Sequence, residues 1–139
     1  MVKSNRKEKM KHSFIAFALI VASQAIAQDN PKSEFARDFL PVWTTSTNNA
    51  VEVAQAMPEE LYDYKPNDSS MTFREQIVHI GFTVSFLTTY FTSETKPEFN
   101  EPDFANKSKA DVVAYLQDNI LKATEIIFNM TEEASQEEV

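Results

Sequence analysis

Glycine and cysteine are almost missing from this chain of 139 residues, which holds one glycine and no cysteine. Tight hairpins, dinucleotide-binding turns and phosphate-binding loops need glycine where φ is positive or where the backbone approaches a ligand closely. The sequence therefore disfavours a β-sandwich, a Rossmann-type fold and a P-loop. Without cysteine, the chain forms no disulfide, thiolate zinc site, cysteine nucleophile or lipid-modified cysteine.

Positive charge is scarce as well, because 13 Lys and Arg residues stand against 21 Asp and Glu residues and give a net charge of −8. A nucleic-acid-binding protein needs a basic surface that neutralises phosphates. We therefore expect no nucleic-acid partner, and we interpret the acidic excess as a source of solubility. The hydrophobic fraction of 42% is ordinary for a folded chain, and the length suits a single domain.

The first 27 residues have the pattern of a secretory signal peptide. Five basic residues precede an apolar run from Phe14 to Ala22, and Ala25-Ile26-Ala27 fits the small-x-small rule for cleavage before Gln28. The alternative is a transmembrane anchor, but the run is shorter than the roughly 20 residues that a spanning helix needs. The sequence thus predicts a signal peptide over 1–27 and an exported domain over 28–139.

We expect this domain to be periplasmic or extracellular and to have no membrane attachment after cleavage. Cleavage would remove five basic residues and one acidic residue, which leaves 8 basic and 20 acidic residues and a net charge of −12. Met10 is an alternative start, because a signal that begins at this residue is complete without the nine residues before it.

A first helix is predicted from Phe35 to Met57, where one stripe of residues recurs at spacings of three and four. Pro41 marks its start or a kink, and Pro58 ends it, because proline disfavours the α conformation in the residue before it. A short turn is expected at Pro58 to Leu61, followed by turn residues over 62–70. The stripe consists of Phe35, Phe39, Val42, Ser46, Ala50, Val53 and Met57.

A second helix begins at a capping box, in which Thr72 and Glu75 satisfy each other's backbone amides. One of its stripes has the spacing of a bundle seam and comprises Phe73, Ile77, Ile80, Val84, Leu87 and Phe91. The opposite side is not polar, since it carries Glu75, His79, Phe82, Phe86 and Tyr90. We therefore expect this helix to be buried on two sides, either in the centre of the bundle or at a subunit interface. Gly81 would allow a neighbouring helix to approach closely.

A third helix follows a loop over 94–107, and Ser108 with Asp111 three residues later forms its predicted N-terminal cap. Its apolar stripe comprises Val113, Leu116, Ile120, Ala123 and Ile127, and we expect it to end near Asn129. Thr131-Glu132-Glu133 then resembles another helix start. The predicted fold is all-α, an up-and-down, antiparallel four-helix bundle whose fourth helix is cut short. A three-helix bundle is the simpler alternative.

Two motifs in the chain resemble those of the DinB superfamily. Met57-Pro58-Glu59-Glu60-Leu61-Tyr62-Asp63-Tyr64-Lys65-Pro66 is similar to the linker of that family, and 71–80 (MTFREQIVHI) is similar to the start of its second helix. Trp43 in the first helix also suits the pattern, so the resemblance covers roughly residues 35–129. It implies a four-helix bundle, often dimeric, with a divalent metal held by three histidines. Some members are thiol-dependent transferases or isomerases, and many have no assigned activity.

The resemblance makes His79 the metal ligand from the second helix, whereas the H-x-x-x-H pair of the fourth helix has no counterpart here. The only other histidine is His12, in the signal peptide. We therefore expect that this chain does not hold zinc or nickel stably and that it is truncated near residue 131. Judged without the family, a lone histidine is more often an interior or interface residue than a ligand. Glu75 either bonds His79, joins it at a metal, or serves only in the capping box.

Three functional hypotheses follow. The first is an exported DinB-like protein whose complete form is a metal-dependent enzyme, of transferase or hydrolase type, that acts on an unidentified small molecule and is inactive or incomplete in this chain. The second is a non-enzymatic helical module that forms a homodimer or binds a partner through an exposed apolar face. The third is a degenerate fragment with little function. Phe82, Phe86 and Tyr90 either line a pocket near His79 or belong to the core. No Ser-His-Asp set can be assembled around a single histidine.

Overall fold

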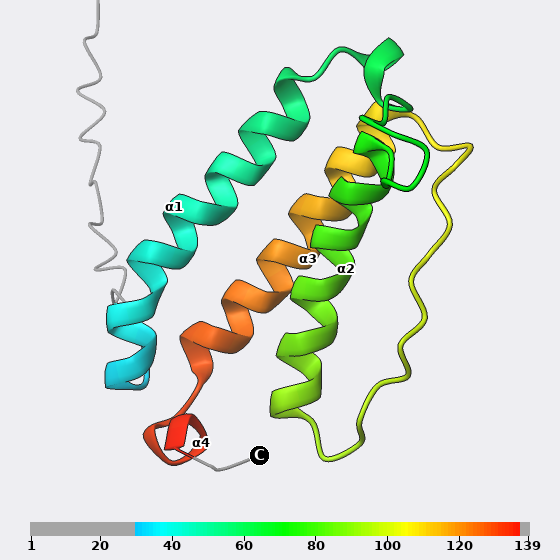
Figure 1. Cartoon of the computed structure of the whole chain (residues 1–139). Coiled ribbons are helices and arrows are strands. Elements are labelled where there is room, and N and C mark those ends of the chain that lie inside the picture. Colours follow the sequence, from blue (N-terminus) through cyan, green and yellow to red (C-terminus); the bar gives the residue numbers. More distant parts are fainter. Residues whose placement is uncertain (1–29, 137–139) are drawn as a thin grey trace, which may run out of the picture.

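The computed structural model describes residues 30–136, and within that range every regular element is a helix (Figure 1). The elements are α1 (Glu34–Ala56), a short 3-10 helix (Glu59–Leu61), α2 (Phe73–Thr92), α3 (Lys109–Asn129) and α4 (Glu132–Gln136). The all-α bundle that the sequence predicts is confirmed. No helix in the described range is long and apolar enough to cross a membrane. The predicted signal peptide over 1–27 and His12 lie outside the described residues.

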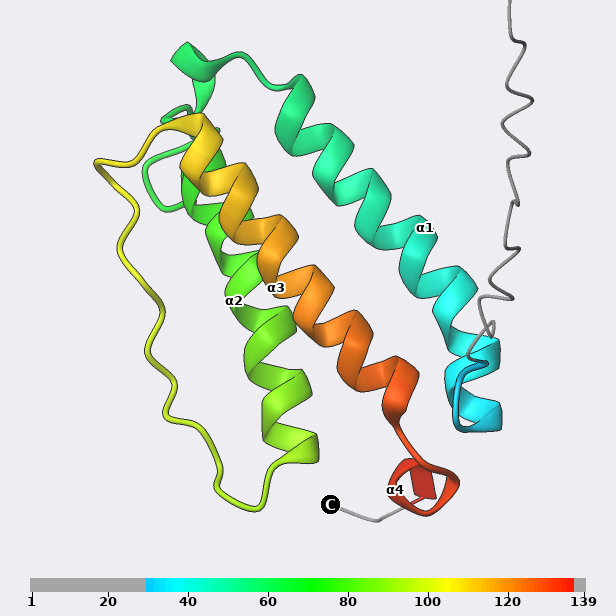
Figure 2. The same ribbon diagram turned by 180° about the vertical axis from the view of Figure 1, so that it is seen from behind.

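Of the three long helices, α3 is the central one, and it packs against α1 on one side and α2 on the other. After α2 the chain runs back along the length of the bundle through residues 93–108 before α3 begins (Figures 1 and 2). As a result, α2 and α3 run in the same direction and α1 runs opposite to both. The sequence pattern reveals the helices but not this order, and it is α3, not α2, that occupies the centre.

Side-chain caps fix where the helices begin. Ser33 accepts a hydrogen bond from the Ala36 amide, and complete capping boxes form at Thr72 with Glu75 and at Ser108 with Asp111. An N-cap contributes on the order of 0.5–2 kcal/mol, because it satisfies an amide that the helix leaves unbonded. The two predicted capping boxes are therefore confirmed.

Pro41 and Pro58 have different effects on α1. Met57 adopts an extended conformation before Pro58, so the helix ends where the sequence predicts. Pro41 is not its start, because α1 begins at Glu34 and continues through this residue. The predicted turn after Met57 is the 3-10 helix at Glu59–Leu61, and the predicted fourth start is α4 at Glu132–Gln136.

The core lies where α2, α3 and the segment after α1 meet. The stripe of α3 is largely confirmed, since four of its members are buried, namely Val113, Leu116, Ala123 and Ile127. The stripe predicted for α1 is not the buried one, because the residues of α1 that are fully buried are Ala36 and Ala54. The side of α1 that faces α3 carries these two small residues together with Trp43, and several larger apolar residues lie on its flank. The wider cluster comprises Ala54, Tyr62, Ile77, Val78, Val112, Val113 and Leu116.

Gly81 lies where α2 comes closest to α3. A Cβ atom at this position would stand 3.1 Å from the Tyr115 ring and 3.3 Å from the Cα atom of Leu116. Both distances are tighter than ordinary van der Waals contact, so the prediction that Gly81 permits close helix approach is confirmed.

Candidate functional site

His79 lies on the side of α2 that faces the connection 93–108. Its Nδ1 atom is 2.9 Å from Oε2 of Glu101, and its Nε2 atom is 3.4 Å from the hydroxyl of Thr83. Because a carboxylate only accepts hydrogen bonds, the Nδ1–H group of His79 donates to Glu101. The imidazole is partly exposed at 41%, and the Glu101 side chain is less exposed at 25%.

Glu75, the acidic residue that the sequence places beside His79, forms its side-chain hydrogen bonds with Thr72 and not with His79. Its carboxylate accepts from the backbone amide of Thr72 at 2.7 Å and from the hydroxyl of the same residue at 3.0 Å. Of the roles considered for Glu75, the structure therefore supports the capping box. The partner of His79 is Glu101, which is 22 residues away along the chain and carries no local signal that would have identified it.

The aromatic side of α2 is covered by Phe99 from the connection. The Phe99 ring meets Phe82 edge-on at 4.8 Å and Phe86 edge-on at 5.2 Å, and Phe82 and Phe86 stack at 5.6 Å. Tyr90 extends the row 5.9 Å from Phe86, with the Lys96 ammonium 4.7 Å above its ring. These rings pack against one another, so the structure supports the core alternative over the predicted pocket.

A cleft of about 670 Å³ opens between the start of α2 and the connection. This volume falls in the range that small-molecule sites occupy. Each of its carboxylates has a partner within the chain: Asp63 bonds Arg74, Glu75 bonds Thr72, Glu101 bonds His79 and Asp103 bonds the Ala105 amide. The cleft is lined by Asp63, Ser69, Ser70, Met71, Thr72, Arg74, Glu75, Val78, Glu101, Pro102, Asp103, Phe104 and Ala105.

Arg74 is one of the residues that line this cleft, and it joins several segments of the chain. Its Nε atom donates to Asp63 at 2.8 Å, its guanidinium also donates to the Lys107 carbonyl, and its Cζ atom lies 5.5 Å from the centre of the Tyr62 ring. The hydrogen bond from Arg74 lowers the pKa of Asp63 below its usual range. This single buried cation therefore ties the family-like linker to the start of α2 and to the end of the connection.

Tyr62 is the centre of that junction. Its side chain is fully buried, its hydroxyl donates to the Ala54 carbonyl at 2.5 Å, and burial raises its pKa. The Phe73 ring meets it edge-on at 5.2 Å. The sequence places Tyr62 in a turn and misses this role, although the resemblance singles out the segment that contains it.

The described residues do not supply the metal site that the resemblance implies. Within residues 30–136 no three His, Cys, Asp or Glu side chains come together in a way that could hold a metal ion. A zinc site needs three or four protein ligands in close geometry. His79 as a metal ligand therefore stays a prediction, and this part of the chain does not provide its companions.

A second feature lies on the opposite flank of α2, where large apolar residues of two helices are exposed. Phe35, Val42 and Val53 of α1 are 45%, 63% and 55% exposed, and Ile80 and Leu87 of α2 are 37% and 43% exposed. We call these five residues the open face. Of the predicted seam residues of α2, Ile80 and Leu87 thus line a surface, whereas Ile77 belongs to the core and Phe73 packs against it. The side chain of Phe91 lies outside those described.

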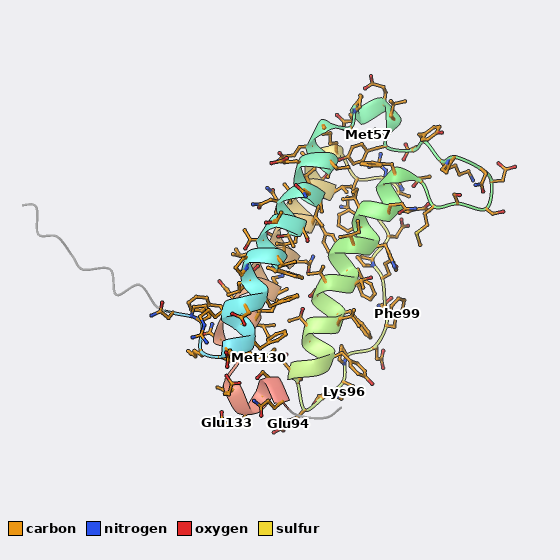
Figure 3. All side chains as sticks on the ribbon, turned by 60° about the vertical axis from the view of Figure 1, so that its left-hand side comes forward. Met57, Glu94, Lys96, Phe99, Met130 and Glu133 are labelled. Atoms are coloured by element: carbon orange, nitrogen blue, oxygen red, sulfur yellow. The ribbon has the colours of Figure 1, made fainter. Side chains whose placement is uncertain are left out.

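Helix geometry places both parts of the open face on one side of the bundle. On α1, Trp43 points to α3, where its indole donates to Thr124 at 2.8 Å, and the open-face residues lie roughly 100° further round the helix. On α2, Gly81 points to α3, and Ile80 and Leu87 lie roughly 100° round in the same rotational sense. Because α1 and α2 run in opposite directions, the two flanks face the same way. Figure 3 views this side, with α1 and α2 in front and α3 behind.

Comparison with known proteins identifies one relationship. The model of the DinB superfamily matches residues 43–139, which span most of α1 and all of α2, α3 and α4. No curated protein and no solved structure matches the chain.

Proposed function

The chain belongs to the DinB superfamily, and we propose that it serves as an exported, non-enzymatic interaction module that forms a homodimer through the open face. The observation that supports this proposal is the exposure of Phe35, Val42, Val53, Ile80 and Leu87 on one side of α3. Several large apolar side chains exposed on one side of a small fold favour an interaction site.

A second copy of the chain is the partner that the charges favour. The protein is strongly acidic overall, and close contact between two like-charged surfaces is unfavourable. The open face limits this cost, since Asp38 is the one acidic neighbour that it has at helical spacing. The other residues beside it on the two helices are uncharged and include Phe39, Ser46, Asn49, Phe73, Gln76 and Val84. A two-fold axis through such a face would pair each apolar flank with its counterpart and keep most carboxylates outside the contact.

The enzymatic alternative requires groups that the described residues do not hold. A metal-dependent transferase or hydrolase of the family type would use three histidines, and residues 30–136 contain only His79. If further donors complete the site, the 670 Å³ cleft beside Glu101 is the place where a small molecule would bind. The interaction module needs no group beyond those present, and we therefore prefer it.

Export forms part of the proposal and rests on the pattern of residues 1–27. The basic start, the apolar run and the Ala25-Ile26-Ala27 site are typical of a cleaved secretory signal. N-terminal sequencing of the protein released by a secreting host tests this step. A new N-terminus at Gln28 supports export with cleavage. An uncleaved protein that still carries residues 1–27 and stays in the membrane fraction contradicts it.

Sedimentation velocity over a range of protein concentrations tests the homodimer. We expect the wild-type chain to show a concentration-dependent monomer–dimer equilibrium and the double variant Ile80→Glu, Leu87→Glu to remain monomeric. Leu121→Glu is the matched control, because Leu121 is equally apolar and 60% exposed but lies on the outer side of α3. A monomeric wild type, or equal dissociation by the control, contradicts the proposal.

A further inference from the structure

We infer that His79 is a positioning residue, which with Glu101 forms a clasp that holds the connection 93–108 against α2. The two side chains meet at 2.9 Å, one from the middle of a helix and one from the middle of a segment without helix or strand. This role differs from the metal ligation that the family resemblance assigns to His79.

The connection needs contacts with α2 to stay in place, because it contains no helix or strand. It runs for the length of α2, and a long segment without secondary structure is costly to order and uncommon in small domains. Its two ends are fixed by Lys96, which donates to the Tyr90 carbonyl, and by the bond from Arg74 to the Lys107 carbonyl. Between these ends, Phe99 and Glu101 contact α2, and further along Phe104 packs on Tyr115 of α3 at 4.7 Å.

The contact with Glu101 does not by itself separate the two roles, since a metal-bound histidine also donates its second nitrogen to a carboxylate. The surroundings of Nε2 do separate them. This atom lies 3.4 Å from the Thr83 hydroxyl, and no set of three ligating side chains exists in the described range. The donor set therefore does not fit the family's metal, whereas Nδ1 fits a hydrogen-bonded clasp to the connection and Nε2 faces Thr83 on the same helix.

The clasp also shapes the cleft. Glu101 lines the 670 Å³ space together with Pro102 and Asp103, so holding Glu101 on His79 fixes that wall. Release of the clasp would let the connection move away from α2 and would expose the backbone around Phe99.

Chymotrypsin cleavage after Phe99 measures this release in the full chain. We expect His79→Ala and Glu101→Ala each to raise the initial cleavage rate by roughly threefold to tenfold, as the loss of one charge-assisted hydrogen bond predicts. The double variant should be no faster than either single variant, because both remove the same contact. His79→Gln should largely restore the wild-type rate, since its amide N–H can still donate to Glu101. Glu98→Ala is the control, as it removes an exposed carboxylate from the same connection.

Equilibrium dialysis against zinc chloride and nickel chloride, with the wild type and His79→Gln, distinguishes the clasp from a metal ligand. We expect the two proteins to retain equal and substoichiometric amounts of either metal. One metal ion per chain that is lost in His79→Gln overturns the inference. Independent, multiplicative effects of His79→Ala and Glu101→Ala on cleavage, or no effect of either, overturn it as well.

Discussion

The two flanks of α2 carry similar apolar residues and have different surroundings. One flank presents Phe82 and Phe86, and Phe99 of the connection covers it, so that Phe82 is only 8% exposed. The other flank presents Ile80 and Leu87, and these remain 37% and 43% exposed. An apolar stripe on a helix therefore indicates that the stripe needs a packing partner. It does not indicate whether that partner is a loop of the same chain or another molecule.

The largest expected effect is a contrast in stability between the two flanks. Phe82→Ala should lower the free energy of unfolding by about 3–5 kcal/mol, because it empties a well-packed position between α2 and the connection. Leu87→Ala should cost less than about 1 kcal/mol in the monomer, since its side chain remains partly in water. Urea unfolding at low protein concentration, where dimerisation contributes little, measures both values. Equal losses would show that the two flanks do not differ.

Removal of the Phe99 ring, which packs on this flank, should lower the stability less than Phe82→Ala does. Phe99→Ala should cost on the order of 1 kcal/mol, because it removes two edge-on aromatic contacts from a ring that is otherwise well exposed. Tyr64→Ala is the control, as Tyr64 is comparably exposed and lies outside this cluster. Thermal unfolding of the wild type, Phe99→Ala and Tyr64→Ala provides the test. A larger loss for Tyr64→Ala than for Phe99→Ala would argue that the connection does not stabilise α2.

The smallest expected effect is on stability at acidic pH, and it depends on the hydrogen bond between Asp63 and Arg74. The hydrogen bond from Arg74 lowers the pKa of Asp63 in the folded state. Its contribution is therefore present above the unfolded pKa of about 3.9 and is lost as the pH falls through the lowered folded value. Asp63→Asn should destabilise the protein slightly at neutral pH and make it less sensitive to acid. Urea midpoints at neutral and acidic pH test this, and unchanged acid sensitivity would contradict it.

Much of the fold can be predicted from local chemistry. Thr72 with Glu75 and Ser108 with Asp111 mark helix starts, because a capping box depends on residues three positions apart. Pro58 marks the end of α1 for an equally local reason. The family motifs were also informative, and the structure explains why. Tyr62 and Arg74, which lie in the two motifs, meet at the junction that joins the first linker to α2.

The features that the sequence does not predict depend on contacts between distant segments. Glu101 and Phe99 lie in a loop with no periodicity, and their partners His79 and Phe82 are recognisable only once the connection is seen to run back along α2. The buried face of α1 differs from the predicted stripe because its fully buried residues are small. Ala36 and Ala54 carry little hydrophobic signal, and the stripe of larger residues beside them is the more prominent one in the sequence.

Disulfide trapping of single-cysteine variants tests the open face as a homodimer interface most directly. The chain has no cysteine of its own, so each introduced residue reports on one position. The account predicts that under mild oxidation a cysteine at Ile80, Val84 or Leu87 forms covalent dimers efficiently at one or more of these positions, whereas a cysteine at Leu121 does not. Efficient dimers from Leu121 alone, or equally low yields at all four positions, would contradict it.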